Sequence, residues 1–184
     1  LRRSSAASDV YKRQIYLYMK VGIIGSGGRE HALCVSLEKS EIIEKIYCFP
    51  GNAGTNQIAE NVNIDISDFK KLTSFVKEKK IEIVLVGPEK PLVDGIVDHL
   101  ENENVKVFGP NKFASQLEGS KIFTKKICKK YEIPTAKFEI YNDKEKAHSF
   151  FKNCNFPVVV KADGLAAGKG AVSYTHLTLP TIVS

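Results

Sequence analysis

The sequence predicts an α/β fold in which a doubly wound parallel sheet is followed by a smaller unit that begins near residue 119. Three observations carry this prediction. Short apolar, often β-branched runs alternate with stretches of helical periodicity from residue 20 to about residue 110. Each of these runs ends in a turn that contains glycine. Beyond residue 119 the order changes to a helix, a strand, a helix and a strand.

The predicted strands of the first unit are short and strongly apolar. They span residues 20–25, 46–49, 81–86 and 105–108. The clearest helix covers residues 67–80, where Phe69, Leu72 and Val76 share one face and Ser67 is the expected N-cap. Because buried parallel strands are apolar along their whole length, the runs favour a sheet with helices on both faces.

A glycine-rich turn follows the first strand. Gly25 and Gly27 match the first two glycines of the dinucleotide fingerprint, but Glu30 stands at the third position. Glycines at such a turn let the backbone approach an anion at the helix N-terminus, so phosphate binding remains open. A simple packing turn is the other interpretation. The second strand leads into a turn at residues 50–55 rather than into an acid for ribose hydroxyls, which disfavours a dehydrogenase.

Three further features of the first unit have two interpretations each. His31 lies one turn into its helix, and packing or capping is favoured over a role as a catalytic base. The turn at residues 50–55 lies at the edge where open α/β sheets receive ligands, yet it also fits a plain surface turn. Glu89, just past the third strand, either holds a ribose hydroxyl or an amine or is a solvated loop acid.

The second unit is predicted to begin with a helix that Gly119 and Ser120 precede. Lys121 and Lys125 lie one turn apart on it, and either meet a phosphate or form a solvated cationic face. Taken by itself, this segment favours the solvated face. The remaining elements are a strand at residues 135–141, a helix at residues 143–152 and a strand at residues 156–161.

A loop rich in glycine and alanine follows the last strand. An apolar run leads into Lys161, and the loop then ends in Lys169 and Gly170. Backbone amides and two cations arranged in this way suit a polyphosphate, although a flexible turn with exposed lysines is the alternative. Only three residues separate Gly164 from Gly168, and no Ser or Thr follows Lys169, so a Walker-type phosphate loop is disfavoured.

Composition excludes several other functions. The net charge is +6, but residues 1–18 carry four basic side chains against one acid and account for +3 of it. Because no basic stripe is interleaved with aromatic residues, we expect no nucleic-acid partner. The four cysteines lack metal-ligand spacing, and no apolar run approaches the length of a membrane helix. A cytoplasmic protein with no membrane partner is the expectation.

The two ends differ in composition from the rest. Met19 is the only methionine and directly precedes the first strand, while residues 173–181 carry no acid, lysine or arginine. We therefore expect residues 1–18 to be a non-native leader and residues 173–184 a non-native tail. Residues 19–118 are the expected first domain, and residues 119–172 the beginning of a second one.

Five blocks of sequence together resemble one family, the phosphoribosylamine–glycine ligases (glycinamide ribonucleotide synthetases) of the ATP-grasp superfamily. The blocks are residues 25–33, 50–55, 86–89, 116–121 and 161–170. The resemblance covers residues 19 to about 172 and implies a Rossmann-like pre-ATP-grasp domain followed by the beginning of an ATP-grasp domain. It implies an ATP-dependent reaction that joins glycine to 5-phosphoribosylamine through a glycyl phosphate.

The resemblance also assigns residues to two ligands. For ATP, they are the phosphate lysines and a mobile glycine loop: Lys121, Lys161, Gly164, Ala166, Ala167, Gly168, Lys169 and Gly170. For phosphoribosylamine, they are Gly25, Gly27, Gly28, Arg29, Asn52, Gly54, Thr55 and Glu89. This assignment replaces the solvated-face interpretation of Lys121.

Other parts of the family's site follow the glycine loop. By resemblance, the ligands of Mg²⁺ or Mn²⁺, the adenine pocket and the glycine site belong there, so we expect no catalytic or metal-ligating residue in the 184 residues and no full reaction by them alone. Two alternatives remain open: another ATP-grasp carboxylate–amine ligase, and a non-catalytic module that binds a phosphosugar or a nucleotide.

Overall fold

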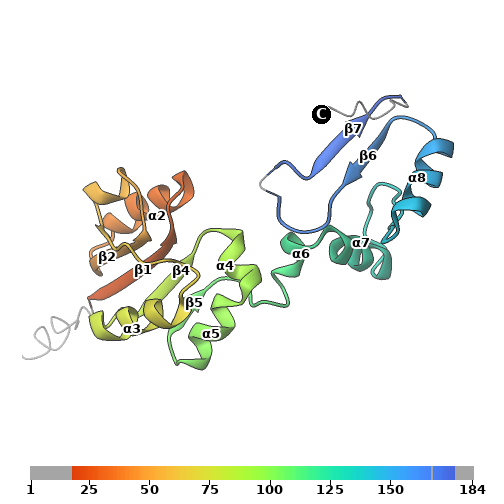
Figure 1. The fold of residues 1–184 in the computed structure, drawn as a ribbon. Coiled ribbons are helices and arrows are strands. Elements are labelled where there is room, and N and C mark those ends of the chain that lie inside the picture. The colour runs from red at the N-terminus through yellow and green to blue at the C-terminus, as the bar shows by residue number, and fades with distance from the viewer. Residues whose placement is uncertain (1–17, 167, 177–184) are drawn as a thin grey trace, which may run out of the picture. The chain divides into compact units, whose positions relative to one another are not determined.

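The structure is a computed structural model that describes residues 18–166 and 168–176. The chain divides into two compact units, with the boundary between Asn111 and Lys112 (Figure 1). No helix among the described residues is long and apolar enough to cross a membrane.

The first unit is a five-stranded parallel sheet with helices on both faces, as predicted. In chain order its elements are β1 (Met19–Gly25), α2 (Gly28–Glu38), β2 (Ile43–Pro50), the 3₁₀ turn η1 (Thr55–Gln57), β3 (Glu60–Asn61), α3 (Phe69–Lys79), β4 (Ile83–Val86), α4 (Glu89–Asp94), α5 (Ile96–Asn102) and β5 (Lys106–Phe108). Strand β3 is the only strand here that the periodicity did not predict, because two residues are too few to show a pattern.

The strand order β3-β2-β1-β4-β5 puts β1 at the centre of the sheet. Strands β2 and β3 follow on one side of β1, and the chain then crosses over and adds β4 and β5 on the other side. In the register, Gly25 stands opposite Pro50 of β2, and Ile24 stands opposite Val86 of β4. The loops that follow β1, β2 and β4 therefore leave the same edge of the sheet, at the point where the winding reverses and open α/β sheets bind ligands.

Two apolar clusters hold the helices on the sheet. One face packs against α3 and α5 through a buried core that includes Ile24, Phe49, Leu72, Val84 and Leu100. The other face packs against α2 through Val21, Ile23, Cys34, Ile46 and Cys48 (Figure 1). The thiols of Cys34 and Cys48 are free and lie 3.3 Å apart, and burial raises the pKa of Cys48 to about 12. These thiols serve as packing groups.

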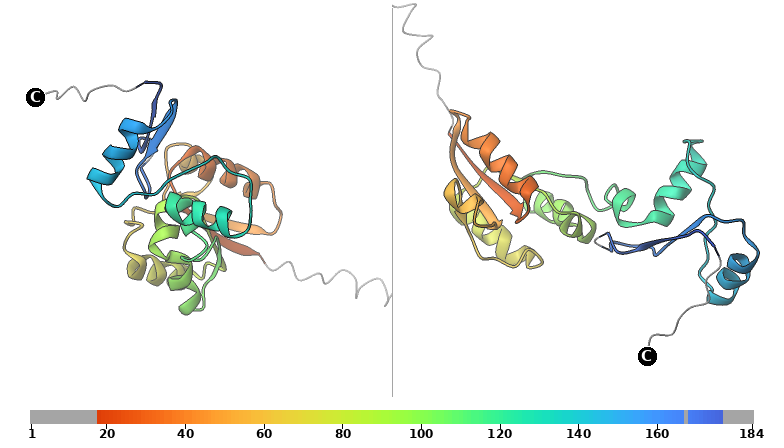
Figure 2. Two further views of the ribbon diagram at one scale, coloured as in Figure 1. Left: turned by 90° about the vertical axis from the view of Figure 1, so that its right-hand side faces the viewer. Right: turned by 90° about the horizontal axis from the view of Figure 1, so that it is seen from above.

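The described part of the second unit contains three helices and one antiparallel pair of strands. They are α6 (Gln116–Gly119), α7 (Lys121–Lys130), α8 (Lys144–Asn153), β6 (Val158–Lys161) and β7 (Ala171–Tyr174). Figure 2 shows α8 beside the β6–β7 hairpin, where the Phe151 ring meets Phe156 and Tyr174 edge to face. Strand β7 pairs through Ser173 and Tyr174, beyond the residue at which the composition changes.

Two local predictions are wrong. Residues 135–141 form no strand, because the only strand pairing in the described part of this unit joins β6 to β7. An isolated extended segment has no ladder to satisfy its backbone. Ser67 does not cap α3. The Asp68 carboxylate accepts a hydrogen bond from Lys71 N at 3.0 Å, while Ser67 donates to Asp65 in a preceding turn.

The identity of the cap gives a direct test. We expect Asp68→Ala to lower the free energy of unfolding by about 1 kcal/mol, because an orphan amide of α3 loses its acceptor. Ser67→Ala, one position earlier, should change it by less than about 0.5 kcal/mol. Urea unfolding of both variants measures the difference, and a larger loss for Ser67→Ala would contradict the assignment.

Candidate functional site

The candidate substrate site lies where the loops after β1, β2 and β4 come together. Backbone hydrogen bonds fix their starting points, since Gly51 N donates to Gly25 O at 3.1 Å and Gly87 N donates to Ile24 O at 3.0 Å. Both bonds extend the ladder of the sheet by one step. The loops thus leave the sheet at defined positions on either side of the β1 terminus.

The loop after β1 needs glycine at its first position. Gly25 has a φ of 127°, a conformation that side chains rarely adopt. The amide of Gly27 is held by Glu30, whose Oε2 accepts its hydrogen at 2.6 Å. This is the Glu half of a capping box, with Glu30 at the third position of α2. The Gly27 amide therefore points at a protein carboxylate, which the sequence did not indicate.

The loop after β2 is tied to the loop after β1 by Asn52. Its Nδ2 donates to Ser26 O at 2.9 Å and to Gly27 O at 3.3 Å. Its Oδ1 accepts from the amides of Gly54 and Thr55 at 2.8 and 3.0 Å. One amide side chain thus organises its own turn and also holds the neighbouring one.

Thr55 is fully buried beneath this turn. Its hydroxyl accepts from Asn52 N at 2.7 Å and can donate either to Asn52 O, 2.9 Å away, or to Asn61 Oδ1, 2.8 Å away. Asn61 Nδ2 in turn donates to Asn52 O at 2.7 Å. The predicted substrate residue Thr55 therefore supports the site from below, and Asn61, which the sequence did not single out, completes the network.

Glu89 and Arg29 face each other across the gap between the loops that follow β1 and β4. Arg29 Nη2 lies 2.9 Å from Glu89 Oε1. The pKa of Glu89 lies below its ordinary value, first because its own backbone N–H at the start of α4 donates to the carboxylate and then because of Arg29. Both side chains are more than one-third exposed, so they are available to a ligand.

His31 packs over the second loop. A Cβ built on Gly54 would lie 2.9 Å from His31 Cε1, so glycine is needed there to admit the imidazole. This contact supports the packing interpretation of His31.

Gly28, another of the predicted substrate residues, is the first residue of α2, and no atom lies within 4 Å of a Cβ built on it.

In the second unit, the glycine loop is anchored to the start of α7. Lys121 Nζ donates to Gly164 O at 2.7 Å. Asp163 accepts from Ile122 N at 3.1 Å and from the Ser120 hydroxyl at 3.0 Å. Desolvation opposes ionisation of Asp163, but these hydrogen bonds outweigh it and lower its pKa. Lys121 is thereby placed at the loop.

The loop itself closes on a short bridge. Ala162 N donates to Gly170 O at 2.8 Å, and Lys169 N donates to Ala166 O at 2.8 Å. The other predicted ATP residues sit in the loop or next to it. Gly164 and Gly168 have φ values of 89° and 79°, Lys161 ends β6, and Ala167 lies outside the described residues. The loop lysines Lys161 and Lys169 extend from the surface.

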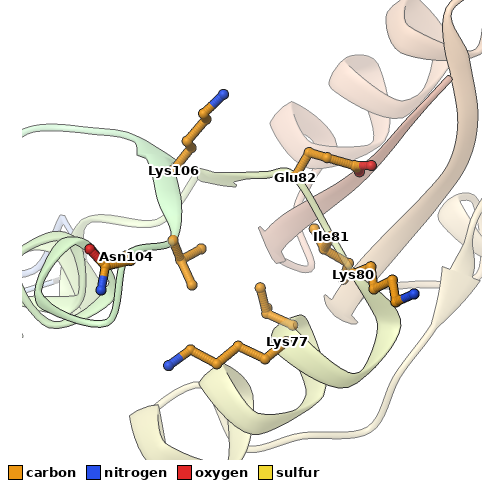
Figure 3. A pocket seen from close by; sticks show the side chains of 8 residues that line it. Lys77, Lys80, Ile81, Glu82, Asn104 and Lys106 are labelled. Atoms are coloured by element: carbon orange, nitrogen blue, oxygen red, sulfur yellow. The ribbon is translucent and has the colours of Figure 1, made fainter. Parts of the chain in front are cut away.

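The described residues offer no group of three acids, histidines or cysteines that fits a metal ion. A pocket of about 250 Å³ does exist in the first unit, lined by Lys77, Lys80 and Lys106 among others (Figure 3). It lies where β4 and β5 begin, at the opposite edge of the sheet from the candidate site. The predicted site is an open edge rather than this pocket.

Solved structures share this architecture. A phosphoribosylamine–glycine ligase from Thermotoga maritima is 35% identical, with a TM-score of 0.67 over 86% of this chain and 36% of that one. An N5-carboxyaminoimidazole ribonucleotide synthetase in complex with ADP is 22% identical, with a TM-score of 0.64 over 86% of this chain and 41% of that one, and shares the fold. Fold and loops define the class: a Rossmann-like domain joined to part of an ATP-grasp domain.

Family models make the class specific. The model described as "Phosphoribosylglycinamide synthetase, N domain" matches residues 19–118. A second model, described as "Phosphoribosylglycinamide synthetase, ATP-grasp (A) domain", matches residues 119–178. The chain belongs to the phosphoribosylglycinamide synthetase family.

Relatives named phosphoribosylamine–glycine ligase share about half of the aligned residues. The relative from Caldanaerobacter subterraneus subsp. tengcongensis is 53% identical over 152 residues, and the one from Mesorhizobium japonicum is 52% identical over 152 residues. Each alignment covers 83% of this chain and 36% of the relative. The chain thus spans about a third of their length.

The buried hydroxyl of Thr55 provides a test of the site's support. Thr55→Val keeps the volume but removes the hydroxyl that bonds Asn52 N and Asn61 Oδ1, so we expect a loss of about 1–3 kcal/mol in the free energy of unfolding. Thr55→Ser keeps the hydroxyl and should lose less. Thermal and urea unfolding compare the two, and a larger loss for Thr55→Ser than for Thr55→Val would show that the methyl group, not the hydroxyl, provides the stabilisation.

The ion pair across the gap predicts a shift in titration. In Arg29→Ala, the pKa of Glu89 should rise, because the cation that favours its charged form is gone. It should stay below its ordinary value, since the backbone N–H of Glu89 still donates. Carbon-detected NMR of the side-chain carboxyl over a pH series measures this, and an unchanged pKa would mean that the two side chains do not pair in solution.

Proposed function

We propose that the chain is part of an ATP-dependent ligase that joins glycine to 5-phosphoribosylamine and forms glycinamide ribonucleotide in purine biosynthesis. The carrying observation is that three loops assigned to the phosphosugar converge on one sheet edge, in a chain 53% identical to a relative named phosphoribosylamine–glycine ligase. A cytoplasmic setting fits the four free cysteines.

The first unit would bind the phosphoribosylamine. Free backbone N–H groups at the start of α2, at Gly28 and Arg29, suit the phosphate, and the Arg29 guanidinium adds charge. Glu89, ionised and exposed, suits a ribose hydroxyl or the amine. The loop from Asn52 to Thr55 sets the third side of the site through its hydrogen bonds to Ser26 and Gly27.

The second unit would hold the phosphates of ATP. Lys121 lies at the glycine loop, and Lys161 and Lys169 flank it. In the proposed reaction, the terminal phosphoryl group moves from ATP to the glycine carboxylate, which releases ADP. The sugar amine then attacks the acyl carbon, the bond from that carbon to the phosphate oxygen breaks, and the amine loses a proton. The cations would stabilise the charge on the transferred group.

Magnesium would supply further charge neutralisation in such a reaction. The described residues contain no fitting cluster of ligands, and Asp163 is committed to Ser120 and Ile122. No step is assigned to the metal.

Ribose 5-phosphate tests the proposal, because it carries the phosphate and hydroxyls of the substrate without the amine. We expect calorimetric titration of the chain to show one binding site, and Glu89→Gln to weaken it about tenfold through loss of a charged hydrogen bond. Glu101→Gln, an exposed acid on α5, is the matched control. The proposal would be overturned if the wild type did not bind ribose 5-phosphate, or if NAD displaced the sugar.

A further inference from the structure

Among the described residues, Glu30 is the one buried side chain that carries a formal charge, with 3% of its surface exposed. Its Oε2 accepts from Gly27 N at 2.6 Å. Its Oε1 is buried and has no hydrogen-bond partner. Burying a carboxyl oxygen without a hydrogen-bond partner costs free energy. Because Glu30 is buried, its role must come from its contacts with the surrounding backbone.

Three glycines surround this carboxylate, two from the loop after β1 and one from the loop after β4. A Cβ on Gly25 would lie 2.7 Å from Glu30 Cδ, and one on Gly27 would lie 2.8 Å from Oε2. A Cβ on Gly87 would overlap Oε1. Glu30 thus fills the space that these glycines leave, and it touches both loops at once.

Gly87 is the informative member of the three. Gly25 needs glycine for its positive φ in any case, whereas Gly87 does not have a positive φ of that kind. No positive φ opposes alanine at residue 87, and the three atoms nearest to a Cβ built there all belong to the Glu30 side chain. The absence of a side chain at residue 87 is therefore explained by Glu30.

We propose that Glu30 is a positioning residue, which fixes the Gly25–Gly28 loop against the loop that carries Glu89, and that Gly87 is glycine in order to admit its carboxylate. The effect on ligand binding rests on the proposed function. Because Glu30 is buried, it acts through the spacing of Gly28 and Arg29 from Glu89 rather than by contact with the substrate.

The same contact explains the departure from the dinucleotide fingerprint. There, the third glycine lets helix and strand pack closely. Here, Glu30 occupies that position and takes the Gly27 amide for itself, so this amide is not available to a ligand phosphate.

A double-mutant cycle between Glu30 and Gly87 tests the proposal with ribose 5-phosphate as the probe. We expect Glu30→Ala and Gly87→Ala each to weaken binding about tenfold, and Gly87→Ala to add less than about twofold in the Glu30→Ala background. Glu30→Gln, which keeps the shape and the acceptor, should stay within about threefold of the wild type. Glu38→Ala, an exposed acid at the other end of α2, is the control.

The amide proton of Gly27 gives a readout that needs no ligand. Its NMR resonance should move upfield in Glu30→Ala and in Gly87→Ala but not in Glu38→Ala. If Glu30→Ala does not fold, Glu30→Asp, too short to reach Gly27, replaces it.

The outcomes separate the two proposals. Equal effects of Gly87→Ala in both backgrounds, or a lower melting temperature with unchanged affinity, would overturn the positioning role. If the wild type binds no ribose 5-phosphate, the proposed function falls. The Gly27 resonance then decides the positioning role alone: coupled shifts support it, and independent shifts reject it.

Discussion

The candidate site depends on the parallel pairing of β1 with β2 on one side and β4 on the other. Parallel strands end at the same edge, so three loops from distant parts of the sequence leave the sheet within reach of one another. Hydrogen bonds from Gly51 and Gly87 to the last residues of β1 extend this pairing into the loops. The sheet thereby supplies the frame on which the polar groups are arranged.

Within that frame, three polar side chains, Asn52, Thr55 and Glu30, hold the loops in place. Asn52 joins the second loop to the first, Thr55 ties the second loop to Asn61 of β3, and Glu30 contacts both the first loop and the third. The hydrogen bonds by which Asn52 and Glu30 hold these loops go to backbone atoms, while Glu30 Oε1 has no partner. The exposed groups, Arg29 and Glu89, then face each other from opposite sides of the gap. Support of the loops and the proposed ligand contact fall to different side chains, although the sequence presents them as one set.

The fold, and the sheet edge at which the candidate site is proposed, could be predicted because both follow from local patterns. Apolar runs and glycine turns located β1, β2, β4 and β5, and the turn after each strand located the site's edge. Long-range partners were beyond reach. Nothing in the sequence pairs Glu30 with Gly87, Thr55 with Asn61, or Asp163 with Ser120, because such contacts exist only after the chain folds. The error at residues 135–141 has the same origin, since strand-like composition does not supply a pairing partner.

A crystal structure with ribose 5-phosphate bound would test the central claim most directly, namely that the edge at β1, β2 and β4 is the phosphosugar site. The account predicts the phosphate at the start of α2 near Gly28 and Arg29, with the ribose hydroxyls facing Glu89. The sugar phosphate at the lysine-lined pocket of the opposite edge (Figure 3), with the three loops empty, would contradict it.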